Sequence, residues 1–356
     1  MDTNIEITNI NNHIFLFDSK KHPKNILNKK NLTKLVDYDF YSINEVKISE
    51  KIKKIHYYSN YFIIVEDYDF VNIGQLNDTF IEKLHLTTEK KYLIFTYKND
   101  VLVDFNDFLF TLLEPRSFVH HIIESFSYLL NGLIQLNEND ICFFNLSPQN
   151  MVFNTNCGDK PQLMDFRLSF ITSTINEDYI THIIKKPNDY THKPLEVHVL
   201  FYLIQNNMST ISYSFIEEIC IVFTKNLTVL ELFSEKYRES YKVAAIEYLK
   251  KYVNKPKRDI ISDILSNHET WDVYSLSVLY LYIFGRVSKI FSLKTTFINK
   301  IALELSKNIH PDPSKRNGLK KLLDNYNNLL FDEKNWDFVT KMERDIMSQL
   351  FGTLEL

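Results

Sequence analysis

The first hundred residues alternate between short apolar runs and polar segments. Over Tyr41–Ile55 the apolar residues instead recur at near-helical intervals, and Asp39 just before them can cap a helix. This part of the chain therefore predicts a small α+β unit, with strands around one helix. The predicted strands are rich in β-branched and aromatic side chains. They include His13–Phe17, Leu32–Val36, Tyr61–Val65 and Tyr92–Tyr97.

The pattern becomes helical after residue 104. Apolar residues recur every three or four positions over Phe118–Leu136, whereas Trp271–Phe284 is apolar on nearly all sides, which predicts a helix buried all round. We find no internal repeat and no long low-complexity linker. The sequence thus predicts a strand-rich lobe over 1–100 and a larger helical lobe over 101–335, followed by a tail over 336–356.

Composition is that of a globular protein without a strong overall charge. The chain has 356 residues, 45% of them hydrophobic, and a formal net charge of −4. This balance gives no general attraction to nucleic acid or to an anionic membrane, so no nucleic-acid partner is expected. Two local basic patches are interpreted mainly as solvated loops and helix ends, with a binding role as the alternative. They comprise Lys20, Lys21, Lys24, Lys29 and Lys30, and Lys250, Lys251, Lys255, Lys257 and Arg258.

The cysteines and the apolar runs of the chain indicate the cellular compartment. The three cysteines, Cys142, Cys157 and Cys220, are irregularly spaced, which supports neither a disulfide framework nor a zinc knuckle. The N-terminus lacks a basic segment followed by an apolar one, and no run reaches the roughly 18 apolar residues of a membrane span. We therefore expect a soluble intracellular protein without a membrane span.

Two segments between the predicted helices carry candidate chemistry. The first runs from Asn145 to Asn150 and reads N-L-S-P-Q-N, and the second is Leu163-Met164-Asp165-Phe166-Arg167. Their order and spacing resemble the catalytic loop, H-R-D-L-x-x-x-N, and the metal-binding D-F-G segment of protein kinases. The resemblance implies a bilobal kinase-like α+β fold that binds ATP, with the side-chain oxygens of Asn150 and Asp165 as ligands of Mg²⁺ or Mn²⁺.

Three later segments extend the resemblance. Pro194-Leu195-Glu196 is similar to the end of the kinase activation segment, and the segment that begins at Asp272 resembles the start of the central buried helix. Asp312-Pro313-Ser314-Lys315-Arg316 resembles a late motif whose arginine pairs with the glutamate of the activation segment. The resemblance therefore implies structural roles for Glu196, Asp272 and Arg316, and a Glu196–Arg316 ion pair.

The small lobe supplies candidate ATP-binding residues. Glu45 resembles the helix glutamate that orients the phosphate-binding lysine, and the best candidate for that lysine is Lys34. Lys29 and Lys30 are rivals, and Lys34 could also be an ordinary surface lysine of a strand. Tyr97 is placed in the same ATP site. The resemblance covers roughly residues 10–335, and in style it is closest to the divergent Ser/Thr kinases of large DNA viruses, which would place the protein in the host cytoplasm or the virion.

Three residues and one missing loop depart from the family pattern. Asn145 stands where the catalytic aspartate is expected, and a neutral amide can orient a hydroxyl but cannot usefully take its proton. No glycine precedes Gly74, so the glycine-rich phosphate loop is missing. Arg167 replaces the glycine of D-F-G, where it could fix the segment sterically or contact a phosphate. Ser147 replaces the lysine or arginine that is usual in the catalytic loop.

These features favour a kinase-like protein with ATP and metal binding, with impaired or absent phosphotransfer, and with a regulatory role. An active divergent Ser/Thr kinase and a nucleotide-free scaffold are the alternatives. A protein partner or substrate is expected, and a helical insertion at about 197–265 is predicted to dock a partner or to cover the substrate groove. His121 and Glu124 have a spacing seen in metal sites, but they are set aside because no companion helix carries a second such pair.

Overall fold

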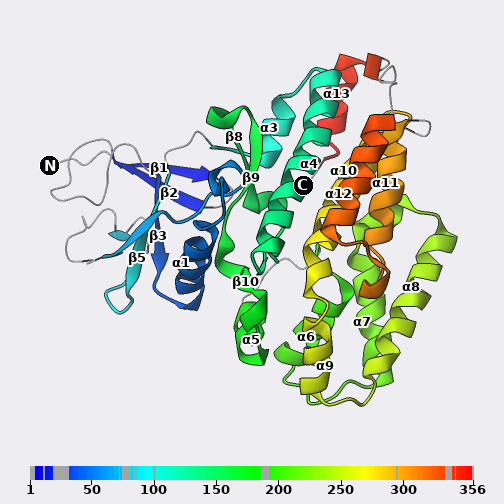
Figure 1. The fold of residues 1–356 in the computed structure, drawn as a ribbon, viewed down its shortest axis with the longest axis horizontal. Coiled ribbons are helices and arrows are strands. Elements are labelled where there is room, and N and C mark those ends of the chain that lie inside the picture. The colour runs from blue at the N-terminus through cyan, green and yellow to red at the C-terminus, as the bar shows by residue number, and fades with distance from the viewer. Residues whose placement is uncertain are drawn as a thin grey trace. The chain divides into compact units, whose positions relative to one another are not determined.

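The chain combines α-helices and antiparallel sheets in a computed structural model (Figure 1). The structure describes residues 5–10, 13–18, 32–71, 73, 81–82, 85–98, 102–185, 192–293, 296–332, 339–340 and 342–354. The α+β class is therefore confirmed. The chain divides into two compact units, which are Met1–Phe108 with Pro148–Phe170, and Leu109–Ser147 with Ile171–Leu356.

A five-stranded antiparallel sheet forms much of the first unit (Figure 1). One helix, α1 (Phe40–Ile52), lies against it, and Val46 of this helix packs on the apolar cluster that Phe95 and Tyr97 help to form. The helix begins as predicted, because the Asp39 carboxylate accepts a hydrogen bond from the Ser42 amide at 2.9 Å. In spatial order the strands are β1 (Ile5–Ile10), β2 (His13–Asp18), β3 (Leu32–Asp37), β5 (Tyr92–Tyr97) and β4 (Asp67–Val71).

The predicted strand at Tyr61–Val65 is wrong. The amide of Ile63 donates to the carbonyl of Leu163 at 2.9 Å, and the amide of Val65 donates to the hydroxyl of Ser49 at 3.1 Å. The segment therefore makes only an isolated bridge to another part of the unit. Its apolar run reflects burial of the side chains, while the strand that pairs with β5 is the exposed Asp67–Val71 segment that follows.

A second antiparallel sheet explains why 148–170 belongs to the first unit. Its strands are β6 (Leu102–Asp104), β8 (Met151–Asn154) and β9 (Lys160–Leu163), in that order. The hydrogen bonds between β6 and β8 attach the chain around Asn150 and Asp165 to this unit, whereas Asn145 lies in the second unit. Three single turns of 3-10 helix flank these strands, at Pro148–Asn150, Thr155–Cys157 and Phe166–Leu168.

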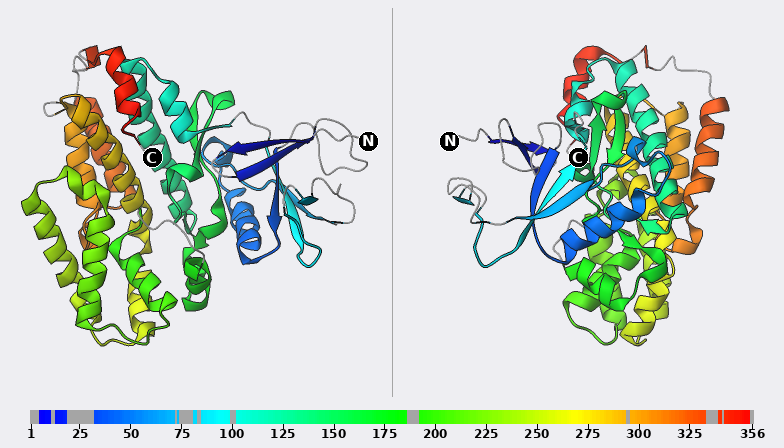
Figure 2. Two further views of the ribbon diagram at one scale, coloured as in Figure 1. Left: turned by 180° about the vertical axis from the view of Figure 1, so that it is seen from behind. Right: turned by 60° about the vertical axis from the view of Figure 1, so that its left-hand side comes forward.

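The second unit is helical. Its centre is α10 (Trp271–Ile290), which buries most of its residues as the sequence predicted, and α4 (Pro115–Glu138) contains the predicted Phe118–Leu136 helix. The helices α10, α11 and α12 lie side by side in the second unit (Figure 2). The remaining helices are α5 (Glu177–Lys185), α6 (Leu195–Gln205), α7 (Tyr213–Asn226), α8 (Glu235–Leu249), α9 (Lys257–Leu265), α11 (Phe297–Asn308), α12 (Leu319–Asp332) and α13 (Arg344–Phe351).

Short elements connect these parts. The helix α3 (Phe105–Thr111) contains the boundary between the two units, and the two-residue strands are β7 (Ile141–Cys142) and β10 (Phe170–Ile171). The predicted insertion at 197–265 is helical, since it contains most of α6 and all of α7, α8 and α9. Within the described ranges, no helix is both long enough and apolar enough to cross a membrane.

Candidate functional site

A cluster of charged side chains lies in the first unit. Lys34 on β3, Glu45 on α1 and Asp165 before the Phe166–Leu168 turn are 6%, 1% and 3% exposed. Their charges act on one another, and those of Glu45 and Asp165 also act on the hydroxyl of Tyr97 on β5. The cluster therefore brings together four of the residues that the sequence assigned to an ATP and metal site.

Asp165 and Arg167 form a bidentate ion pair. The Nε of Arg167 donates to Oδ1 of Asp165 at 2.5 Å, and Nη2 donates to Oδ2. Burial opposes the charged guanidinium, but the hydrogen bonds and charge of Asp165 prevail and raise the pKa of Arg167 above its usual value. Both carboxylate oxygens of Asp165 are thus bound by one cation.

The local backbone explains how Arg167 reaches Asp165. Asp165 has a positive φ of 63°, a conformation that aspartate tolerates better than most residues. The next three residues form a turn of 3-10 helix, Phe166–Leu168, so the long side chain of Arg167 can fold back over the carboxylate. The positive φ falls on Asp165 and not on Arg167, so Arg167 has a backbone conformation that ordinary residues can adopt.

This ion pair was not predicted from the sequence, in which Arg167 could fix the segment sterically or contact a phosphate. The available signal was a long cationic side chain two residues after an aspartate, at the position where the family has glycine.

Helix α1 holds the turn from the other side. The side-chain amide of Asn44 donates to the carbonyl oxygens of Arg167 at 2.9 Å and Ser169 at 2.8 Å. Phe166 is fully buried, and its ring packs edge-on against Phe62 with a centroid distance of 6.0 Å. The turn that carries Asp165 and Arg167 is therefore fixed both by hydrogen bonds and by the core.

Burial controls the ionisation of the cluster. It lowers the pKa of Lys34, and the nearby carboxylates of Glu45 and Asp165 oppose that shift. Burial also raises the pKa of Glu45 to about 7, against the opposing charge of Lys34. The Tyr97 hydroxyl donates to Oε1 of Glu45 at 3.4 Å, whereas Oε2 has no hydrogen-bond partner among the described residues.

The predicted metal ligands Asn150 and Asp165 belong to neighbouring segments of the first unit. The carbonyl of Asn150 accepts a hydrogen bond from the amide of Met164 at 3.0 Å. A magnesium ion needs several oxygen ligands in near-octahedral geometry, but both oxygens of Asp165 are already held by Arg167. The guanidinium therefore neutralises the Asp165 carboxylate and occupies part of its acceptor capacity, which disfavours a divalent cation there.

Asn145 belongs to the second unit, in a loop anchored to the start of α10. The carboxylate of Asp272 accepts hydrogen bonds from the amides of Phe143 and Phe144, both at 2.8 Å. Lys193 donates to the carbonyl of Phe144 from the other side. Burial raises the pKa of Asp272, and these contacts oppose the shift. The backbone before Asn145 is therefore fixed by a buried carboxylate, which is a structural role for Asp272.

The predicted ion pair between Glu196 and Arg316 is present in the second unit. Nη1 and Nη2 of Arg316 lie 2.7 and 2.9 Å from the two carboxylate oxygens of Glu196. Arg316 also donates to the hydroxyl of Thr270 and to the carbonyl of His310. The pair joins the start of α6 to the loop before α12.

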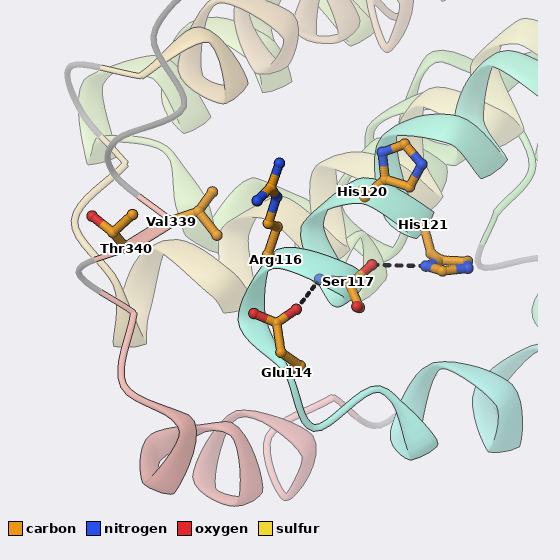
Figure 3. A pocket seen from close by; sticks show the side chains of 7 residues that line it. All are labelled: Glu114, Arg116, Ser117, His120, His121, Val339 and Thr340. Carbon is orange, nitrogen blue, oxygen red and sulfur yellow. Dashed lines mark hydrogen bonds between the residues drawn. The ribbon is translucent and has the colours of Figure 1, made fainter.

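A pocket of about 860 Å³ lies in the second unit at the start of α4 (Figure 3). Glu114, which lines this pocket, caps α4 by accepting a hydrogen bond from the amide of Ser117. This bond holds the pKa of Glu114 below its usual value. His121 bonds to the carbonyl of Ser117, and Glu124 lies 3.5 Å from His120. His121 and Glu124, which were set aside as a metal site, therefore make contacts within α4.

Of the two basic patches, only the second lies within the described residues. The patch from Lys20 to Lys30, including the rival lysines, lies outside the described residues. In the second patch Lys251 pairs with Asp263 at 2.7 Å, and Lys257 lies 3.6 Å from Glu177. Acidic neighbours therefore neutralise part of this patch.

No family model matches the sequence, and no curated protein matches it. Among solved structures, the chain is similar to the twitchin kinase region from C. elegans, with 11% sequence identity and a TM-score of 0.48. The match covers 99% of this chain and 50% of that one, so the chain spans about half the length of the solved structure.

Proposed function

We propose that this chain is a kinase-like protein that binds a nucleotide and a protein partner, with phosphotransfer impaired or absent. The observation that carries the proposal is the Asp165–Arg167 ion pair. A guanidinium that binds both oxygens of an aspartate neutralises its charge and occupies part of its acceptor capacity, which weakens it as a ligand of the metal ions that neutralise the phosphates in kinases. Asn145, at the position of the catalytic base, would in addition remove a proton acceptor.

Several contacts support the kinase-like part of the proposal. Segments selected from the sequence only by their order and spacing make specific contacts within each unit. Lys34 and Glu45 join Asp165 in one cluster, and Glu196 pairs with Arg316. A chance similarity of short motifs would not require such contacts between residues 120 positions apart.

The proposed nucleotide site lacks part of the phosphate-binding structure that the family resemblance implies. Lys34 supplies a positive charge in the cluster, as the family resemblance requires. The absence of glycine before Gly74 works against tight binding, because side chains would hold the backbone away from the phosphates. We therefore expect weak nucleotide binding, and a role in which the bound nucleotide adjusts partner binding. Docking of that partner on the 197–265 insertion stays a prediction.

A phosphotransfer assay tests the proposal. With labelled ATP, Mg²⁺ or Mn²⁺ and generic protein acceptors, we expect no transfer above the background of a mock preparation. Transfer that persists in Asp324→Ala, which changes an exposed residue of α12, but disappears in Asp165→Ala would contradict the proposal and favour an active kinase. A melting temperature that ATP leaves unchanged, with or without metal, would favour the nucleotide-free scaffold.

A further inference from the structure

The guanidinium of Arg167 has N–H donors that the pair with Asp165 does not use. An arginine carries five N–H donors, and the pair with Asp165 engages Nε and Nη2. Both hydrogens of Nη1 and one of Nη2 remain, and no described residue accepts a hydrogen bond from Nη1. The Arg167 side chain is 29% exposed, whereas that of Asp165 is 2% exposed. One edge of the guanidinium is therefore bound to a buried carboxylate, and the other can receive a ligand.

The free edge suits a phosphate group. The planar fork of an arginine matches two phosphate oxygens, and it does so without the strict coordination geometry that Mg²⁺ requires. Lys34 adds a second cation to the same cluster, where its charge acts together with those of Asp165 and Arg167. The cluster thus offers two cationic groups for an anionic ligand beside two carboxylates, of which that of Asp165 is bound to Arg167 and that of Glu45 has a raised pKa.

Arg167 is also held in place. Asn44 binds the backbone carbonyls on both sides of Leu168, so the turn that carries Arg167 is attached to α1. A metal that bound Asp165 would have to share the buried carboxylate with the guanidinium, against the repulsion of the two cations, or displace the guanidinium. Removal of one partner from a buried pair is strongly unfavourable. The local structure therefore favours the guanidinium over a metal ion.

We propose that Arg167 is a built-in cation that replaces the divalent metal, so that this chain binds the phosphates of a nucleoside triphosphate through Arg167 without a metal ion. This inference rests on the nucleotide binding proposed above. It gives Asp165 a changed role, in which the carboxylate orients an arginine and does not coordinate a metal. Nucleotide binding then becomes independent of magnesium.

Titration of the full chain with ATP in EDTA, and again in excess Mg²⁺, tests this inference by calorimetry. We expect binding in EDTA that Mg²⁺ does not strengthen. Arg167→Gln should weaken binding in EDTA by about tenfold to a hundredfold, the range for loss of a charged hydrogen bond. The matched control is Arg286→Gln, which changes a half-buried arginine that stacks on Tyr282 in the second unit, and it should bind like the wild type.

A second measurement uses Mn²⁺ alone, detected by electron paramagnetic resonance. Wild type should bind no more Mn²⁺ than Asp165→Asn, whereas Arg167→Gln should gain binding because it frees the carboxylate. If Arg167→Gln does not fold, the double variant Asp165→Asn with Arg167→Gln avoids a buried unpaired charge. This double variant should lose ATP binding in EDTA.

The outcomes separate the two proposals. ATP binding by wild type only in the presence of Mg²⁺, or Mn²⁺ binding by wild type that Asp165→Asn abolishes, would overturn the built-in cation and leave nucleotide binding in place. Absence of ATP binding in both conditions would overturn the proposed nucleotide binding, and the inference with it. Equal binding by wild type and Arg167→Gln in EDTA would show that Arg167 is not the phosphate ligand.

Discussion

Arg316 and Glu196, which lie 120 residues apart in the sequence, face each other through two hydrogen bonds of 2.7 and 2.9 Å. Neither side chain is exposed to solvent. The guanidinium is further bound by the Thr270 hydroxyl and the His310 carbonyl, and it lies over the ring of Tyr274. Such a pair offsets the cost of burying two charges only while both partners are present.

Removal of either partner should therefore destabilise the protein strongly. We expect Glu196→Ala or Arg316→Ala to lower the free energy of unfolding by about 3–5 kcal/mol, because each leaves an uncompensated buried charge. Urea unfolding followed by tryptophan fluorescence measures this change. The control is Lys320→Ala, which breaks a pair with Glu138 in which Lys320 is 70% exposed, and which should cost less than about 1 kcal/mol. Equal costs for Arg316→Ala and Lys320→Ala would contradict the prediction.

The Glu196–Arg316 pair was predictable because the resemblance to protein kinases, carried by the order and spacing of the motifs, implied it. The same holds for Lys34, Glu45 and Asp165, which the structure gathers in one cluster. By contrast, an apolar run reports burial and not backbone pairing, so Tyr61–Val65 could not be distinguished from a strand. The partner of Arg167 depends on the positive φ of Asp165 and the turn that follows, and no local pattern in the sequence specifies that geometry.

The stability of the protein should depend on pH through Glu45. Its pKa is about 7 in the folded protein against a usual 4.5, so between these values the folded state binds more protons than the unfolded state. The free energy of unfolding should therefore fall as the pH rises from about 4.5 to about 7, with a slope of at most about 1.4 kcal/mol per pH unit. Urea unfolding of wild type and Glu45→Gln across this range measures the contribution, which the variant should lack.

Glu50→Gln is the control for Glu45, since Glu50 lies on the same helix, is exposed and pairs with Lys53 at 2.6 Å. It should keep the wild-type pH dependence. A wild-type slope that survives in Glu45→Gln would assign the dependence to other groups.

Asn145→Asp tests which departure from the family pattern limits phosphotransfer. If the missing base is limiting, the variant should raise any measured transfer rate by about 10²- to 10⁴-fold. If the Asp165–Arg167 pair is limiting, only Asn145→Asp combined with Arg167→Gly should gain transfer, because it restores the base and also frees the carboxylate. Transfer from labelled ATP to a generic acceptor distinguishes these results. Asn139→Asp, in the cap of α4, is the control for adding a carboxylate in the same unit. No gain in either variant would leave the missing glycine-rich loop and Ser147 as the limiting departures.

Asn44 should determine the stability of the turn that carries Asp165 and Arg167. It is 3% exposed, and its amide donates to the carbonyls of Arg167 and Ser169, so Asn44→Ala removes two buried hydrogen bonds. We expect a loss of about 1–3 kcal/mol in the free energy of unfolding, because the two carbonyls lose a donor that water cannot easily replace. Hydrogen exchange should show faster exchange of the amides from Phe166 to Ser169. Asn206→Ala, which removes an exposed asparagine bonded to its own helix, should leave both measurements close to those of wild type. Unchanged exchange in Asn44→Ala would mean that the core packing of Phe166 alone holds the turn in place.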